Sequence, residues 1–219
     1  MTLRRSAQAR RISLRVSRLD GKISVTAPRH VATDEVLNFL NGQSDWLARA
    51  VQDVAPMTAV KDGTALPFRG QICQVHHLGP KRKPVELDAE QRLLVGGAAA
   101  QIGVKLSVFL KEAARSELAR QVPELAWEIG KNAGKITLRD TRSRWGSCTQ
   151  SGDLMFSWRL IMAPPEVLRY VAAHEVAHLR HMDHSRAFWD TVAVLMPDFE
   201  APRRWLKKNG TELHRYKFK

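Results

Sequence analysis

Alternating apolar and polar residues open the chain. Residues 12–16 (Ile-Ser-Leu-Arg-Val) and 23–26 (Ile-Ser-Val-Thr) each place every second side chain on one face, which is the pattern of a half-buried strand. The Asp-Gly pair at 20–21 favours a tight turn, so we expect an antiparallel hairpin. Thr33 is suited to capping a helix, and apolar residues then keep roughly a helical spacing to about Val54.

Three further apolar runs predict strands. Residues 65–78 are expected to form one strand with a bend at Gly70. Residues 85–87 and 93–95 lie on either side of a turn and predict a second hairpin.

The second half of the chain has mainly helical periodicity. A long helix is predicted over residues 99–121, and Pro123 is expected to open a separate short helix. Strands are expected near residues 136–138 and 154–160. Pro165 is suited to the first position of the next helix.

The Gly-Gly pair at 96–97 separates these two patterns. We therefore expect a β-rich part with one helix over residues 1–95 and a mainly helical part over residues 96–219. The fold class is α+β.

The chain is strongly basic. Among 219 residues, 35 Lys and Arg stand against 22 acids, for a net charge of +13, and the basic residues gather at the two ends. Such a surplus suggests acidic or phosphate-rich partners, including nucleic acid or nucleotides. A solvated basic surface explains it equally well.

The composition also bounds the cellular setting. Cys73 and Cys148 lie far apart without a C-x-x-C pair, so a cysteine zinc site is not indicated and reduced cytoplasmic thiols are the simple interpretation. The N-terminus has no apolar signal-peptide core. The longest uncharged run, residues 93–104, is too short and too Gly-rich to span a bilayer. We expect a cytoplasmic protein without membrane contact.

The stretch His-Glu-Val-Ala-His at 174–178 carries the chemistry. Residues four apart lie on the same face of a helix, so His174 and His178 would direct two imidazoles to one spot, with Glu175 beside it. Two histidines and a third ligand suit a zinc ion that keeps one position open for water. The adjacent carboxylate would be the general base.

Two later histidines compete for the third ligand position. His181 would stay on the same helical face if the helix continued, but three ligands along one straight helix fit a tetrahedral ion poorly. His184 lies six residues after His178, the spacing found in metzincins. We expect the helix to end near Met182 and the chain to turn at Asp183, so that His184 completes the site and His181 is the second choice.

Four motifs in order resemble a known family. RWGSC at 144–148, FSWRL at 156–160, YVAAHEVAHL at 170–179 and HSRAFW at 184–189 resemble the YgjP-like metal-dependent hydrolases, a branch of the zincin-like metallopeptidases. The resemblance covers nearly the whole chain. It implies a zincin-like core, in which helices pack on a small antiparallel sheet, following an N-terminal β-rich subdomain.

The resemblance also implies roles for individual residues. His174, His178 and His184 would be zinc ligands, and Glu175 would be the catalytic carboxylate. The implied activity is hydrolysis of a peptide or protein by a zinc-activated water.

Substrate contacts follow less directly from the sequence. Arg144 could bind a substrate carboxylate or phosphate, or could pair with an acid near the site, and Arg159 is a second candidate for substrate binding. Zincin proteases usually bind an extended substrate along an edge strand, and the strand over residues 154–160 is the expected edge.

Two other functions agree with the composition. One is metal-dependent hydrolysis of a nucleotide phosphoanhydride, although no Walker-type phosphate loop is present. The other is a nucleic-acid-binding protein with a structural zinc, which the basic ends and six tryptophans would suit. A structural zinc would normally have four protein ligands.

Overall fold

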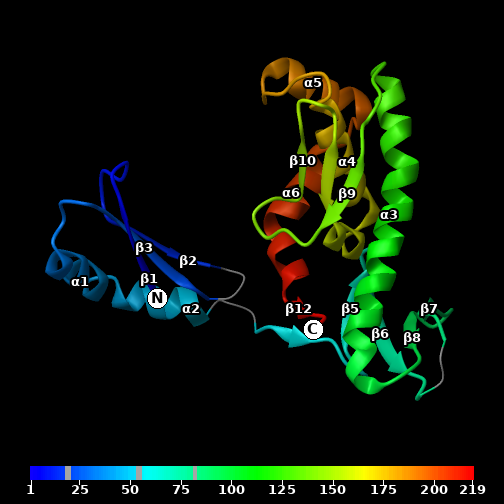
Figure 1. Ribbon diagram of the computed structural model, residues 1–219, viewed down its shortest axis with the longest axis horizontal. Coiled ribbons are helices and arrows are strands. Elements are labelled where there is room, and N and C mark those ends of the chain that lie inside the picture. The colour runs from blue at the N-terminus through cyan, green and yellow to red at the C-terminus, as the bar shows by residue number, and fades with distance from the viewer. Residues whose placement is uncertain (18–20, 53–55, 81–82) are drawn as a thin grey trace. The chain divides into compact units, whose positions relative to one another are not determined.

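The computed structural model describes residues 1–17, 21–52, 56–80 and 83–219. It has the expected α+β fold, and it divides into two compact units, Met1–Thr58 and Ala59–Lys219 (Figure 1). The division differs from the boundary expected after residue 95. The strands that precede residue 95 belong with the long helix that follows them, because both contribute to one apolar core.

The first unit is a small sheet with two helices. Its elements are β1 (Thr2–Ser6), β2 (Ser13–Val16), β3 (Ile23–Pro28), α1 (Thr33–Asn41) and α2 (Ser44–Gln52). The strand order is β1-β3-β2, and β2 and β3 are antiparallel as predicted, although Asp20 of the expected turn lies outside the described residues.

Thr33 does not cap α1. The N-cap position is Ala32, without a side-chain cap, and the Thr33 hydroxyl accepts a hydrogen bond from Arg5 at 3.1 Å. A contact from a distant strand has replaced the local cap that the sequence predicted.

The second unit begins with a four-stranded sheet in the order β5-β6-β8-β7. Its strands are β5 (Ala65–Phe68), β6 (Gln71–His77), β7 (Glu86–Leu87) and β8 (Arg92–Val95). The predicted hairpin of β7 and β8 is confirmed.

The expected bend at Gly70 is instead a complete reversal. Strands β5 and β6 are antiparallel, and Arg69 and Gly70 between them have φ values of 50° and 78°, a left-handed pair typical of a tight hairpin turn. Glycine tolerates this conformation, but arginine rarely adopts it, so the sequence pattern did not indicate a turn. The Arg69 amide donates to the Ile161 carbonyl at 2.8 Å, which anchors the turn.

A short 3-10 turn, η1 (Ala99–Gln101), precedes helix α3 (Ile102–Glu128). Helix α3 continues through Pro123 without a break. The separate short helix predicted at Pro123 is therefore wrong. A proline inside a helix costs about 3 kcal/mol, but here the helix is buried on both sides of it. Leu118, Val122 and Leu125 are all 0 % exposed.

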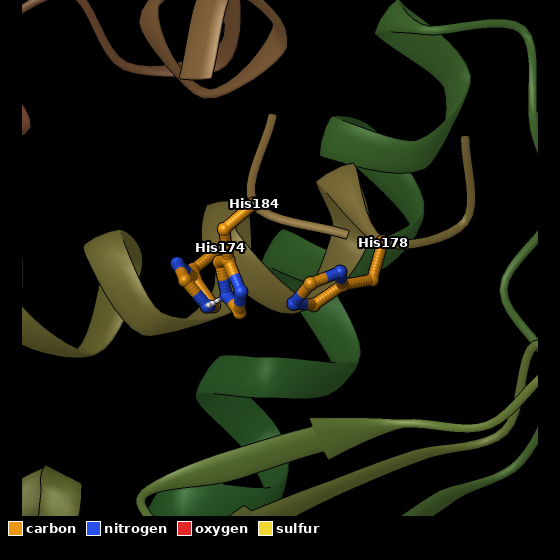
Figure 2. Close-up of side chains that lie close together, drawn as sticks. All are labelled: His174, His178 and His184. Carbon is orange, nitrogen blue, oxygen red and sulfur yellow. Dashed lines mark hydrogen bonds between the residues drawn. The ribbon is translucent and has the colours of Figure 1, made fainter. Parts of the chain in front are cut away.

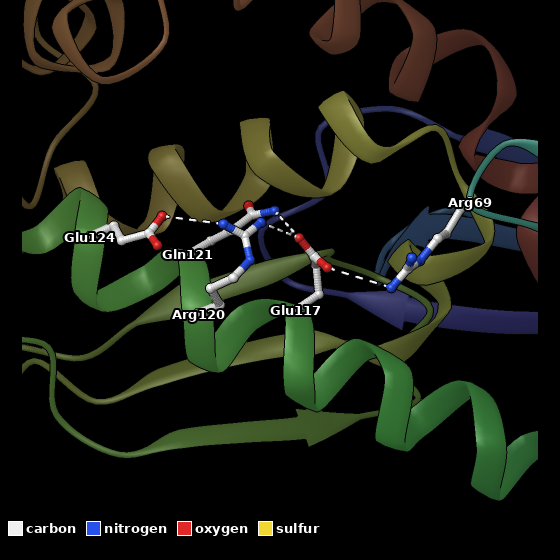
Figure 3. A network of polar contacts seen from close by, with 5 residues as sticks. All are labelled: Arg69, Glu117, Arg120, Gln121 and Glu124. Atoms are coloured by element: carbon white, nitrogen blue, oxygen red, sulfur yellow. Dashed lines mark hydrogen bonds and ion pairs between the residues drawn. The ribbon is translucent and has the colours of Figure 1, made fainter.

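Figure 3 shows a chain of polar contacts along α3. Glu117 pairs with Arg120 at 2.6 Å and with Arg69 of the β5–β6 turn at 3.6 Å. The hydrogen bond from Arg120 is the main influence that lowers the pKa of Glu117. Arg120 and Arg69 are more than half exposed, so these pairs contribute little to stability and mainly orient the turn on the helix.

A second small sheet has the order β10-β11-β9. It consists of β9 (Ile136–Arg139), β10 (Gly146–Cys148) and β11 (Leu154–Ser157), and a 3-10 turn, η2 (Trp158–Met162), follows β11. The strand expected over residues 154–160 therefore ends earlier, and it is the central strand instead of an edge. Strands β9 and β10 are the two edges, because both pair with β11, and β10 is the edge that contacts α4.

The remaining elements pack around helix α4 (Pro165–Ala177), which begins at Pro165 as predicted. They are α5 (Arg186–Leu195), α6 (Glu200–Asn209), η3 (Gly210–His214) and β12 (Tyr216–Lys217); the short β4 (Thr58–Ala59) lies at the boundary of the units. Helix α4 contacts α3, α5, α6 and β10. It ends before the expected position near Met182.

Within the described residues, no helix is both long enough and apolar enough to cross a membrane.

The buried face of α3 yields a stability prediction. Leu110→Ala should lower the free energy of unfolding by about 2–5 kcal/mol, because Leu110 is 0 % exposed and its removal leaves a cavity. Val108→Ala on the same helix, where the side chain is 60 % exposed, should change it by less than about 0.5 kcal/mol. Urea unfolding measures both, and equal losses would contradict this assignment of the buried face.

Candidate metal centre

Three histidines converge where α4 ends (Figure 2). His174 lies in the last turn of α4, His178 is its C-cap, and His184 lies in the turn before α5. One ring nitrogen from each lies within 4.8 Å of the others, and the Nε2 atoms of His174 and His184 are 3.2 Å apart. The third member of this group is His184, and His181 is not part of it.

His181 has a different role in the turn. Its carbonyl oxygen lies 2.9 Å from Nδ1 of His178. An Nδ1–H donated to this oxygen fixes the tautomer and leaves the Nε2 lone pair of His178 for a ligand. The main chain of His181 thus orients a ring, although its own imidazole stays outside the group.

The three rings fit a metal ion. Burial lowers the pKa of His174 to about 4 and also lowers the pKa of His178, so both rings are neutral near pH 7 and present lone pairs. Zinc–nitrogen distances of about 2.0–2.1 Å in a tetrahedral site separate two ligand atoms by about 3.3 Å. The 3.2 Å between His174 and His184 agrees with that spacing.

Aromatic side chains hold the rings in place. Phe188 of α5 is 0 % exposed, and its ring centroid lies 4.9, 4.5 and 4.9 Å from those of His174, His178 and His184. Trp189 forms a second wall beside His174 at 5.7 Å. Helical spacing alone does not show that this one residue packs on all three histidines.

Glu175 lies on the opposite side of α4 from solvent, against strand β10. It is only 5 % exposed. Burial raises its pKa to about 7, while the nearby Arg144 acts in the other direction. A Cβ atom at Gly146 would overlap Oε1 of Glu175 and lie 2.6 Å from its Cγ, so a larger residue there would force the Glu175 side chain to move. This contact accounts for the glycine in the RWGSC motif.

Two other residues of the RWGSC motif, Trp145 and Cys148, have structural surroundings that account for them. Trp145 packs against His214 with a 4.9 Å centroid distance, and a Cβ at Gly210 would lie 3.0 Å from its ring. Burial and the charge of Glu175 raise the pKa of Cys148 to about 11. The thiol therefore stays protonated and does not act as a nucleophile.

The two arginines proposed as substrate contacts lie in different surroundings. Arg159 is buried, pairs with Asp140 at 2.6 and 3.1 Å, and donates to the carbonyls of Leu213 and Tyr216 at 2.8 and 3.2 Å. Its guanidinium is thus occupied in holding the C-terminal segment. Arg144 is exposed and acts on Glu175, so it remains a candidate for substrate binding.

Comparison with known proteins agrees with this site. The family described as YgjP-like, metallopeptidase domain matches residues 10–209. The chain belongs to the YgjP-like metallopeptidase family. It is therefore a metal-dependent hydrolase with an α+β metallopeptidase fold, as the sequence motifs predicted.

Comparisons with curated proteins and with solved structures add little to the family assignment. No curated protein matches the chain. The crystal structure of the metallopeptidase zymogen of Pyrococcus abyssi abylysin aligns with 42% of this chain and 93% of its own, at 19% identity and a TM-score of 0.38.

Gly146→Ala should disable the site without removing its histidines. The added methyl overlaps the Glu175 carboxylate, and under the catalytic role that the sequence predicts for Glu175, a displacement of about 1 Å costs about 100-fold in turnover. We expect a loss of that size in kcat for peptide hydrolysis, with metal content unchanged. Gly42→Ala is the matched control, because its Cβ would meet its nearest neighbours at an ordinary 3.6 Å. Full activity in Gly146→Ala would show that this contact does not position Glu175.

Proposed function

We propose that this protein is a zinc metallopeptidase. His174, His178 and His184 bind the ion, and Glu175 is the general base. The observation that carries the proposal is the convergence of three imidazoles next to one buried carboxylate. Three protein ligands leave a position open for water, which is typical of catalytic rather than structural zinc.

In this proposal the metal site and Glu175 have different roles in hydrolysis. When bound here, zinc supplies a Lewis acid that polarises the scissile carbonyl and lowers the pKa of water towards about 7. Glu175 takes a proton from the attacking water and passes it to the leaving amine. Burial raises the pKa of Glu175, which makes its carboxylate a stronger base, and the positive charge of a bound zinc ion would act in the opposite direction.

Strand β10 is the proposed binding edge for the substrate. It is the outer strand of its sheet next to α4. An extended peptide that pairs with β10 would pass Gly146 and so come next to Glu175. This geometry favours a peptide or protein substrate, since its main chain supplies the required hydrogen-bonding groups.

Replacing the two candidate third ligands should give unequal results. His184→Ala should weaken zinc binding by more than about 100-fold, beyond the loss usual for an outer partner. His181→Ala should retain zinc, because only the main-chain carbonyl of this residue contacts the site. Elemental analysis after competition with a chelator measures both. The opposite result would assign the third ligand to His181.

Glu175→Gln separates metal binding from catalysis. Glutamine has the size of glutamate but cannot take a proton, so kcat should fall by about 100- to 10,000-fold while zinc content stays at the wild-type value. Glu166→Gln in the exposed first turn of the same helix should leave kcat unchanged. Turnover of a quenched fluorescent peptide is the measurement, and undiminished activity in Glu175→Gln would exclude it as the base.

A further inference from the structure

The β9–β11–β10 sheet has a hollow on the face that points away from Glu175. Gly146, Leu138 and Phe156 share a row across the sheet, and Ser147, Thr137 and Met155 form the next row. Successive side chains of a strand point to opposite faces. Since Gly146 faces Glu175, the second row faces the other way, and it lines a cavity of about 310 Å³.

The lining of this cavity is suited to an anion. Arg139 and Arg144 contribute positive charge, and Thr137 and Ser147 contribute hydroxyl groups that are not engaged within the described residues. The hydroxyls of Thr141 and Thr149 also line the cavity, but they bond to neighbouring backbone and side-chain oxygens. Hydroxyl and guanidinium groups together are typical partners of a carboxylate.

No acid in the described part of the chain forms an ion pair with Arg139. Asp140, which follows Arg139, is paired with the buried Arg159. Asp153 also lines the cavity and keeps its negative charge while its Oδ1 accepts the Lys135 amide at 2.8 Å, but it forms no salt bridge with Arg139. Arg139 is exposed and forms neither a salt bridge nor a side-chain hydrogen bond with any residue in the described part of the chain. Its charge is therefore available to a ligand.

The cavity is adjacent to the proposed active site. Ser147, in its lining, directly follows Gly146, which contacts Glu175. Arg144 lines the same cavity and lies close enough to Glu175 to lower its pKa. The side chains of an extended peptide alternate between two faces, so a peptide along β10 with one residue at Glu175 directs its neighbours to the cavity side.

We propose that this cavity is a substrate subsite for an acidic side chain, an Asp or Glu next to the residue at the cleavage site. The inference rests on the proposed peptidase function and adds a substrate class to it. Arg139 determines the charge preference, and the Thr137 and Ser147 hydroxyls complete the carboxylate site. The net charge of +13 fits a preference for acidic peptides.

Peptide binding tests the subsite independently of turnover. Fluorescein-labelled decapeptides with Glu, Gln or Lys at alternate positions are titrated into the zinc-loaded full chain carrying Glu175→Gln, with fluorescence anisotropy as the readout. The Glu peptide should bind at least about tenfold more tightly than the Gln peptide, the usual worth of a charged hydrogen bond. Equal binding of all three peptides would overturn the proposal.

Substitutions at Arg139 assign the preference to this cavity. In the same background, Arg139→Gln should reduce binding of the Glu peptide to that of the Gln peptide, and Arg139→Glu should favour the Lys peptide. The control is Arg115→Gln, which removes a charge from an arginine of α3 that is also exposed. It should leave the affinity for all three peptides unchanged. A Glu preference that survives Arg139→Gln, or is lost in Arg115→Gln, would place the preference elsewhere.

Hydrolysis by the wild type separates this proposal from the proposed function. If no peptide is cut but the Arg139-dependent binding persists, the subsite stands and the peptidase mechanism fails. If peptides are cut equally well whatever their charge, and Arg139→Gln leaves kcat/KM unchanged, the mechanism stands and the subsite fails.

Discussion

The close approach of helix α4 to strand β10, at Glu175 and Gly146, is the constraint on which the rest of the site depends. A residue with a Cβ at this point would displace the Glu175 side chain, and burial raises the pKa of Glu175 to about 7. His174 precedes Glu175 directly, and His178 lies one helical turn further on. One helix–strand contact therefore fixes Glu175 relative to the histidine group.

Strand β10 keeps its place because the chain before and after it is anchored. The Ser157 amide donates to the Trp145 carbonyl at 2.8 Å, and Trp145 packs against His214. Arg159 joins Asp140, at the start of the loop to β10, to the C-terminal carbonyls. A buried arginine is costly unless its N–H groups are paired, so the C-terminal segment and this loop stabilise each other. Residues far from the three histidines thus hold β10, and with it the contact to Glu175, in position.

The sequence predicted the features that depend on local spacing. Helix-face geometry placed His174 and His178 together, and a turn after the helix brought His184 to them as expected. Features that depend on distant partners were not predictable. The continuation of α3 through Pro123 rests on the burial of its flanking turns, and the role of Arg159 rests on carbonyls more than fifty positions away. Strand alternation did not reveal which strand would be the edge, because edges are set by pairing.

Under our proposals, one face of β10 contributes to catalysis and the other to substrate recognition. Gly146 faces Glu175, and Ser147, one residue later, faces the cavity that we propose as the acidic subsite. A one-residue shift in register would exchange these faces, so the strand cannot move to alter specificity without losing the position of Glu175. Specificity can change only through side chains of the outer face, such as Arg139. Relatives that keep the glycine but replace this arginine would then cut differently charged peptides by the same chemistry.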